Sequence, residues 1–136
     1  SDEPIRATNV MDRWILSRLA NAIATANHSF EQLELSTAAD VLYRFWWEEL
    51  CSVYIEAIKP VFPFDGSRPS AELLERQPVV QQILYRCFEQ GLRLLHPFMP
   101  YITEELWQRL PGTRATRSIC ITEYPARTEH HDPALE

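Results

Sequence analysis

Leu94-Leu95-His96-Pro97-Phe98-Met99-Pro100-Tyr101-Ile102-Thr103-Glu104-Glu105-Leu106-Trp107, followed by Gln108-Arg109-Leu110, is the stretch that decides the fold. A residue that precedes proline is disfavoured in helical geometry, so His96 and Met99 mark breaks in the chain. Proline suits the first turn of a helix, where its missing N–H is not needed, and a new helix therefore begins at Pro100. Apolar side chains then recur at four-residue steps until Pro111-Gly112 ends the helix. The stretch predicts a helix, a sharp corner and a final helix over 100–110.

Apolar periodicity predicts two long helices in the first part of the chain. The first follows Asn9, a good N-cap residue, and extends to about Phe30 with one apolar face. The second begins at Ser36 or Thr37, where either hydroxyl suits an N-cap, and ends at Lys59-Pro60. Its apolar arc is wide and rich in aromatic residues, which indicates contacts on more than one side.

A loop and a third long helix connect these two helices to the corner. Three prolines and a Gly-Ser pair make residues 60–69 a loop. The third helix is predicted from Pro78 to Leu95, and residues 70–77 also admit a short helix capped by Ser70. Gly91 lies inside the third helix, where glycine costs about 1 kcal/mol relative to alanine. A close approach of a neighbouring helix would explain this glycine.

These elements predict an all-α fold, an antiparallel bundle of four long helices. One additional short helix is possible. Residues 1–8 are a lead-in, residues 9–111 form the bundle, and residues 112–136 comprise a loop, a short extended segment and a polar tail. The extended segment is predicted as a short strand over 118–124, because Ile119 and Ile121 alternate with polar residues. A single domain suits a chain of 136 residues with 46% hydrophobic side chains.

Composition and charge argue against several classes of function. A net charge of −6 and a pI of about 5.2 disfavour a generic nucleic-acid binder, although a small basic face on an acidic body remains compatible. No apolar run approaches the roughly 20 residues that span a bilayer, so no membrane partner is expected. The acidic start does not resemble a signal peptide. Cys51 and Cys87 fall in helical patterns and are predicted as buried thiols in a reducing compartment.

The sequence contains no recognisable catalytic or metal-binding constellation. Phosphate loops, Gly-rich dinucleotide turns and nucleophile elbows are all missing from it. The ring of His96 is predicted to hydrogen-bond the backbone at the corner, and His130-His131 lies in the polar tail without partner ligands. Glu104 and Glu105 fall in the first turn of the final helix, where the helix dipole favours negative charge. We therefore predict no catalytic residue, metal ligand or cofactor in this chain.

Two groups of residues remain as candidates for binding. They are Arg13, Trp14 and Arg18 in the first helix, and Arg44, Trp47 and Lys59 in the second. Single-stranded RNA loops are bound by such residues, with bases stacked on aromatic or arginine planes and hydrogen-bonded at their edges. Spacing alone favours the simpler interpretation, in which the aromatic residues are core and the cations lie on a solvated face. Trp46 lies within the apolar stripe and is predicted as a core residue.

Three segments carry a resemblance to a known family. The corner resembles the pattern Leu-Leu-x-Pro-x-x-Pro-aromatic-x-x-Glu-Glu-Leu-Trp/Tyr of the helical anticodon-binding domain in class I aminoacyl-tRNA synthetases. Met11-Asp12-Arg13-Trp14-Ile15-Leu16-Ser17-Arg18-Leu19 resembles the entry helix of the valine and isoleucine enzymes. Phe45-Trp46-Trp47-Glu48-Glu49-Leu50-Cys51-Ser52-Val53-Tyr54-Ile55-Glu56-Ala57-Ile58-Lys59-Pro60 is similar to the valine branch in particular. The chain departs from that branch at Ser52, where Asp is usual, so any salt bridge made by that Asp is in doubt here.

The resemblance covers residues 8–125 and implies a fragment of a valine-specific synthetase whose bundle binds the anticodon stem-loop of tRNA(Val). It implies that this chain alone is not an enzyme. The parent would join valine to tRNA using ATP and Mg²⁺ in a catalytic domain outside this chain, which would be a second partner. The RNA-binding residues expected on this basis are Arg13, Trp14, Arg18, Arg44, Trp47 and Lys59. Arginine would bind a base edge or phosphate, an aromatic ring would stack, and Lys59 would pair with a phosphate.

Two other functions remain open at this point. The chain could be the same domain of an isoleucine enzyme, or a protein-interaction bundle that binds no RNA. A cytoplasmic location is expected, with a mitochondrial parent also open. An Arg-lined face at the end of the first two helices remote from the His96 corner would favour RNA binding.

Overall fold

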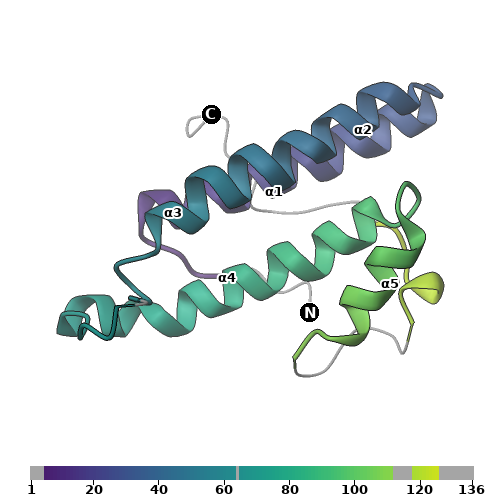
Figure 1. Ribbon diagram of the computed structural model, residues 1–136. Helices are drawn as coiled ribbons and strands as arrows, with labels where there is room; N and C mark the ends of the chain where they lie inside the picture. The colour runs from purple at the N-terminus through teal and green to yellow at the C-terminus, as the bar shows by residue number, and fades with distance from the viewer. Residues whose placement is uncertain (1–4, 64, 112–117, 126–136) are drawn as a thin grey trace.

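The computed structural model describes residues 5–63, 65–111 and 118–125 as helices joined by short connections (Figure 1). The first helix, α1, spans Val10–Glu31. Its N-cap is Asn9, as predicted, whose side-chain oxygen accepts hydrogen bonds from the backbone N–H of Met11 at 2.9 Å and of Asp12 at 3.3 Å. These bonds satisfy two of the donors that every helix start leaves open.

A second rod lies alongside α1 and is built from three consecutive elements: α2 (Leu35–Tyr43), η1 (Arg44–Tyr54) and α3 (Ile55–Ala57). The helix begins one residue before Ser36, after Glu34, which makes no side-chain cap. The prediction that Ser36 or Thr37 caps this helix was therefore wrong.

The middle of this rod, η1, is a π-helix, which the sequence did not predict. A π-helix makes i→i+5 hydrogen bonds and winds more widely than an α-helix. The buried side chains of η1 follow that wider period, at Phe45, Glu49, Leu50 and Tyr54. The wide turn keeps these large side chains on one face over 11 residues, where a regular α-helix would rotate some of them away.

The third long helix, α4, is one continuous element over Ala71–Leu95 and runs below the other two rods (Figure 1). Ser70 is its N-cap, with the side-chain oxygen accepting from Leu73 N–H at 3.3 Å. The prediction of a separate helix starting at Pro78 was wrong, because Pro78 lies inside α4. Proline removes the hydrogen bond to the carbonyl of Leu74. Both residues are exposed, so water can satisfy that carbonyl.

Gly91 leaves room on α4 for the Trp46 ring of η1, so a side chain of the second rod explains this glycine, rather than the predicted close approach of a neighbouring helix. A Cβ atom added to Gly91 would lie 2.6 Å from Cζ2 of Trp46. The indole N–H of Trp46 also donates to the carbonyl of Gly91 at 3.2 Å. Trp46 is only partly exposed and packs against the core, as predicted.

The corner ends α4 and begins α5, which spans Pro100–Gln108 with proline in its first turn. The predicted hydrogen bond between the His96 ring and the backbone was wrong. The ring instead places Nδ1 2.8 Å from Oγ1 of Thr103. Thr103 and Trp107 are the buried residues of α5. Ile102 and Leu106, which recur at helical spacing, are instead 49% and 44% exposed.

The segment after α5 is a 3₁₀ turn, η2 (Ile119–Ile121), so the predicted short strand was wrong. A strand requires a paired neighbour, and the described residues form none. The carboxylate of Glu104 fixes this turn instead. It accepts hydrogen bonds from Ser118 Oγ and from Ile119 N–H, each at 2.8 Å.

The main core lies between α1, the second rod and α4. Cys87 is buried in it, as predicted, but Cys51 is exposed because it faces outward on η1. The loop predicted over 112–117, the tail and His130-His131 lie outside the described residues. Among the residues that are described, no helix is long and apolar enough to cross a membrane.

Candidate nucleic-acid interface

Arg18 and Glu49 form an ion pair that joins α1 to η1. The Arg18 side chain is 16% exposed and that of Glu49 is 11% exposed. Burial raises the pKa of Glu49, although the hydrogen bond and charge of Arg18 act in the opposite direction. The guanidinium of Arg18, a predicted RNA-binding group, is therefore committed to holding two helices together.

A second buried polar group joins α1, η1 and α4. The Tyr54 hydroxyl donates to Oδ1 of Asp12 at 2.8 Å, and Arg76 donates to the same oxygen at 3.1 Å. Burial and the Asp12 charge raise the pKa of Tyr54 far above its usual value of 10. The sequence pattern missed this group, because its members are 42 and 64 residues apart.

Arg13 and Trp14 lie next to this buried group, at the start of α1. Arg13 is exposed, whereas Trp14 is partly buried and packs against the main core. The Asp12–Tyr54 bond and the Arg18–Glu49 pair together show that α1 and the second rod are antiparallel, because residue numbers rise along one and fall along the other. Arg13 therefore lies at the end of the bundle to which α3 and Lys59 also belong.

Lys59 lies at this same end, remote from the His96 corner. Its side chain is 54% exposed, and the amine donates to Oε1 of Glu56 at 2.8 Å. Lys59 lines an open hollow of about 510 Å³ with Arg68, Asp65 and Ser70. Arg68 was missed at the sequence level, because a single cation in a proline-rich loop has no periodic signal.

Arg44 and Trp47 lie farther along the rod, on the outer side of η1, and both are exposed. The Trp47 ring is 62% exposed and stacks with Tyr43, with 6.5 Å between ring centroids and 18° between planes. Both rings line a second hollow of about 450 Å³, opposite Leu95 and Met99. This hollow lies beside the corner rather than at the remote end.

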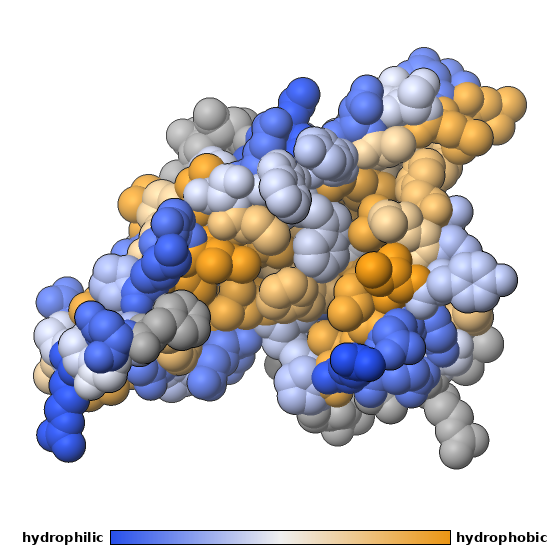
Figure 2. Space-filling view, viewed as in Figure 1, coloured by the Kyte–Doolittle hydropathy of each residue, from blue (hydrophilic) through white to orange (hydrophobic). Residues whose placement is uncertain are grey.

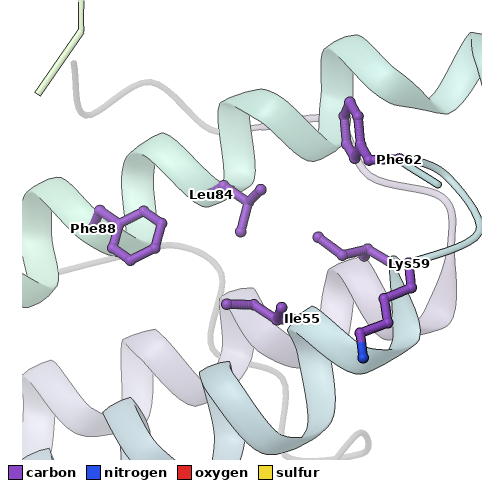
Figure 3. A pocket seen from close by; sticks show the side chains of 6 residues that line it. Ile55, Lys59, Phe62, Leu84 and Phe88 are labelled. Atoms are coloured by element: carbon purple, nitrogen blue, oxygen red, sulfur yellow. The ribbon is translucent and has the colours of Figure 1, made fainter. Parts of the chain in front are cut away.

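A third hollow, of about 250 Å³, lies between α3 and the middle of α4. Figure 3 shows Ile55 facing Leu84 across it, with Phe88 on α4, Phe62 on the loop that follows α3 and the Lys59 amine pointing away. Its lining is almost entirely apolar.

The six predicted residues therefore do not form one site. Arg13, Trp14 and Lys59 lie at the remote end, Arg44 and Trp47 lie along η1, and Arg18 is engaged between helices. At the remote end Lys59 and Arg68 alternate with Glu56 and Asp65, so the surface there is mixed in charge rather than uniformly basic. In the described part of the chain, no group of three His, Cys, Asp or Glu side chains could hold a metal ion.

Residues 12–136 match the family model described as the anticodon-binding domain of tRNA ligase. The chain is 47% identical over 132 residues to a valine–tRNA ligase of Takifugu rubripes, covering 91% of this chain and 10% of that protein. It is 45% identical over 127 residues to a mitochondrial valine–tRNA ligase of Mus musculus, covering 91% of this chain and 11% of that protein. A Homo sapiens valine–tRNA ligase is 41% identical over 140 residues, covering all of this chain and 10% of that protein. The chain thus spans about a tenth of the length of these relatives.

Proposed function

Because the chain belongs to the family of anticodon-binding domains of tRNA ligases, we propose that it binds the anticodon stem and loop of a tRNA that accepts valine. The observation that carries the choice of valine is the identity of 41–47% to proteins named valine–tRNA ligase. The Phe45–Pro60 segment, which is similar to the valine branch, supports the same choice.

We propose further that the whole protein joins valine to this tRNA. ATP and Mg²⁺ would act in a catalytic domain outside the present chain, and that domain would be its second partner. The relatives include proteins named mitochondrial, so the expected cytoplasmic location stays a prediction.

Phosphate contacts are assigned in this proposal to exposed cations. Lys59 and Arg68 line one hollow and can reach the same stretch of RNA backbone, while Arg13 extends this surface along α1. Arg44 remains a proposed base or phosphate contact on η1. Arg18 would act indirectly, since its pair with Glu49 fixes the spacing of α1 and η1. Trp14 would likewise support Arg13 from the core side, and stacking on Trp47 stays a prediction.

Titration of the isolated chain with a valine anticodon stem-loop at low salt tests the proposal. An acidic body with few phosphate contacts should bind weakly, and the affinity should fall as salt rises. The control is the same stem-loop with the A and C at the end of the anticodon replaced. We expect the control to bind more weakly. Equal affinity for the two stem-loops would exclude specific recognition of the valine anticodon. An isoleucine anticodon that bound more tightly would point to the isoleucine branch.

A further inference from the structure

The Lys59 amine, a proposed phosphate contact, already faces an anion of the protein itself. It lies 2.8 Å from Oε1 and 2.5 Å from Oε2 of Glu56, so both carboxylate oxygens point at it. Phosphate oxygens bind an ammonium group through the same charge-assisted hydrogen bonds. A phosphate that approaches Lys59 must therefore either displace the Glu56 carboxylate or lie against its negative charge.

The local backbone holds Glu56 and Lys59 together and leaves their side-chain ends in water. Their i, i+3 spacing puts both side chains on one side of the chain where α3 ends. Ile58 and Val61 anchor this turn in the core, and Val61 N–H donates to the Ile58 carbonyl at 2.9 Å. Figure 2 shows hydrophilic side chains gathered at this end of the molecule, which carries α3 and the start of α4. An exposed ion pair contributes little to stability, so this one can open without disturbing the fold.

Asp65, the other acidic residue of the Lys59–Arg68 hollow, is engaged differently. Its Oδ1 accepts a hydrogen bond from the backbone N–H of Ser67 at 2.9 Å, which shapes the loop just before Arg68. The Asp65 carboxylate therefore serves the loop. The Glu56 carboxylate instead faces the amine that the RNA would use.

We propose that Glu56 is an internal competitor for the RNA phosphate at Lys59, and that it sets the affinity of this surface for RNA. The inference rests on the proposed function, because it takes Lys59 to be a phosphate contact. Binding at Lys59 then exchanges one anion for another, which yields less free energy than filling an unpaired cation. Affinity differences within one interface lie mostly in the dissociation rate, so Glu56 keeps the bound RNA ready to leave.

Removal of the Glu56 charge tests the proposal. Glu56→Gln should raise the affinity for the valine stem-loop about threefold at low salt, because an exposed ion pair no longer competes. The gain should shrink as salt rises, since screening weakens both pairings. Glu105→Gln is the matched control, because Glu105 is also exposed, pairs with Arg109 on its own helix and changes the net charge equally. It should leave the affinity unchanged, and equal affinities for the natural chain and Glu56→Gln overturn the proposal.

A double-mutant cycle separates competition at Lys59 from a general effect of charge. In a Lys59→Gln background the amine is gone, so Glu56→Gln should change the affinity no more than Glu105→Gln does. The same gain in both backgrounds overturns the proposal in favour of general repulsion. The stem-loop with the A and C replaced should gain as much as the valine stem-loop, because a phosphate contact carries no sequence information. A gain confined to the valine stem-loop overturns the proposal in favour of a base contact by Glu56.

Lys59 is the only lysine of the chain, so labelling with lysine enriched in 13C at Cε gives one side-chain NMR signal that reports its contacts. If the stem-loop binds and this signal does not move, the proposed function stands and this inference fails. If the signal moves and Glu56→Gln tightens the binding of two stem-loops that the natural chain does not distinguish, this inference stands and recognition of the valine anticodon fails. If neither chain binds either stem-loop, both fail.

Discussion

At Gly91 the packing leaves no room for a side chain. A Cβ atom there would lie 2.6 Å from the Trp46 ring, which is itself held by its bond to the Gly91 carbonyl. Gly91→Ala should therefore lower the free energy of unfolding by about 1–2 kcal/mol, since overpacking costs more than the gain in helix propensity. Urea denaturation measures this change.

A comparison with a double variant shows whether the Trp46 ring causes the loss of stability in Gly91→Ala. In a Trp46→Leu background the ring is gone, so Gly91→Ala should be neutral or stabilise by about 1 kcal/mol. The same loss in both backgrounds would contradict the close approach of Trp46 and Gly91 as its reason.

Tyr54 places a hydroxyl next to a buried carboxylate, and its removal should be costly. Tyr54→Phe should lower the free energy of unfolding by about 1.5–3 kcal/mol, because Asp12 loses a donor. The folded-state pKa of Tyr54 is raised above its ordinary value of 10, so its contribution is fully present below pH 10 and is lost as pH rises above that. Thermal unfolding between pH 7 and pH 11 should therefore show a steeper alkaline loss for the natural chain than for Tyr54→Phe.

Tyr101 is the matched control for this prediction, because it is 92% exposed. Tyr101→Phe should leave both the stability at pH 7 and its decline above pH 10 unchanged. Parallel alkaline curves for the natural chain and Tyr54→Phe would show that the Asp12–Tyr54 bond does not couple ionisation to folding.

The start of α4 tests the assignment of caps at the scale of a helix. Ser70→Ala should lower the free energy of unfolding by about 1 kcal/mol, because Leu73 N–H loses the acceptor at the helix start. Ser36 offers a matched control, since it lies inside the first turn of α2 and caps nothing. Ser36→Ala should be neutral or slightly stabilising in the same urea titration. If Ser36→Ala lowered the free energy of unfolding more than Ser70→Ala, Ser36 would be the N-cap of the second rod, as the sequence pattern predicted.

The helix boundaries show which features of the fold can be predicted from sequence. Asn9, Ser70 and the Pro97–Pro100 corner act through their immediate neighbours, and all three were predicted correctly. The π-helical winding of η1 was not predicted, because it depends on which side chains the neighbouring helices bury. Pro78 was wrongly predicted to begin a helix. It is tolerated inside α4 because it and Leu74, whose carbonyl loses its hydrogen bond, are both exposed to water.

The candidate site was less predictable than the fold for a related reason. Arg18 belongs to the right helix, but its engagement by Glu49 depends on a residue 31 positions away. Arg68 has no pattern around it, and only the folded loop places it beside Lys59. The exposure of Trp47 beside a fully buried Phe45 likewise follows from the rotation of η1 and could not be read from composition.

For the whole molecule, the proposed phosphate contacts lie at the remote end of an acidic body. If Lys59 and Arg68 each neutralise a phosphate, then the double variant Lys59→Gln, Arg68→Gln should bind the valine stem-loop more weakly at every salt concentration. The slope of log affinity against log salt should fall by about 1.4, since a single-stranded contact contributes about 0.7. Arg109→Gln is the matched control, because Arg109 is also exposed but lies at the end of α5, paired with Glu105. Its slope should equal that of the natural chain. Equal slopes for all three proteins would move the phosphate contacts away from the Lys59–Arg68 hollow, leaving Arg13 and Arg44 as the cations that carry them.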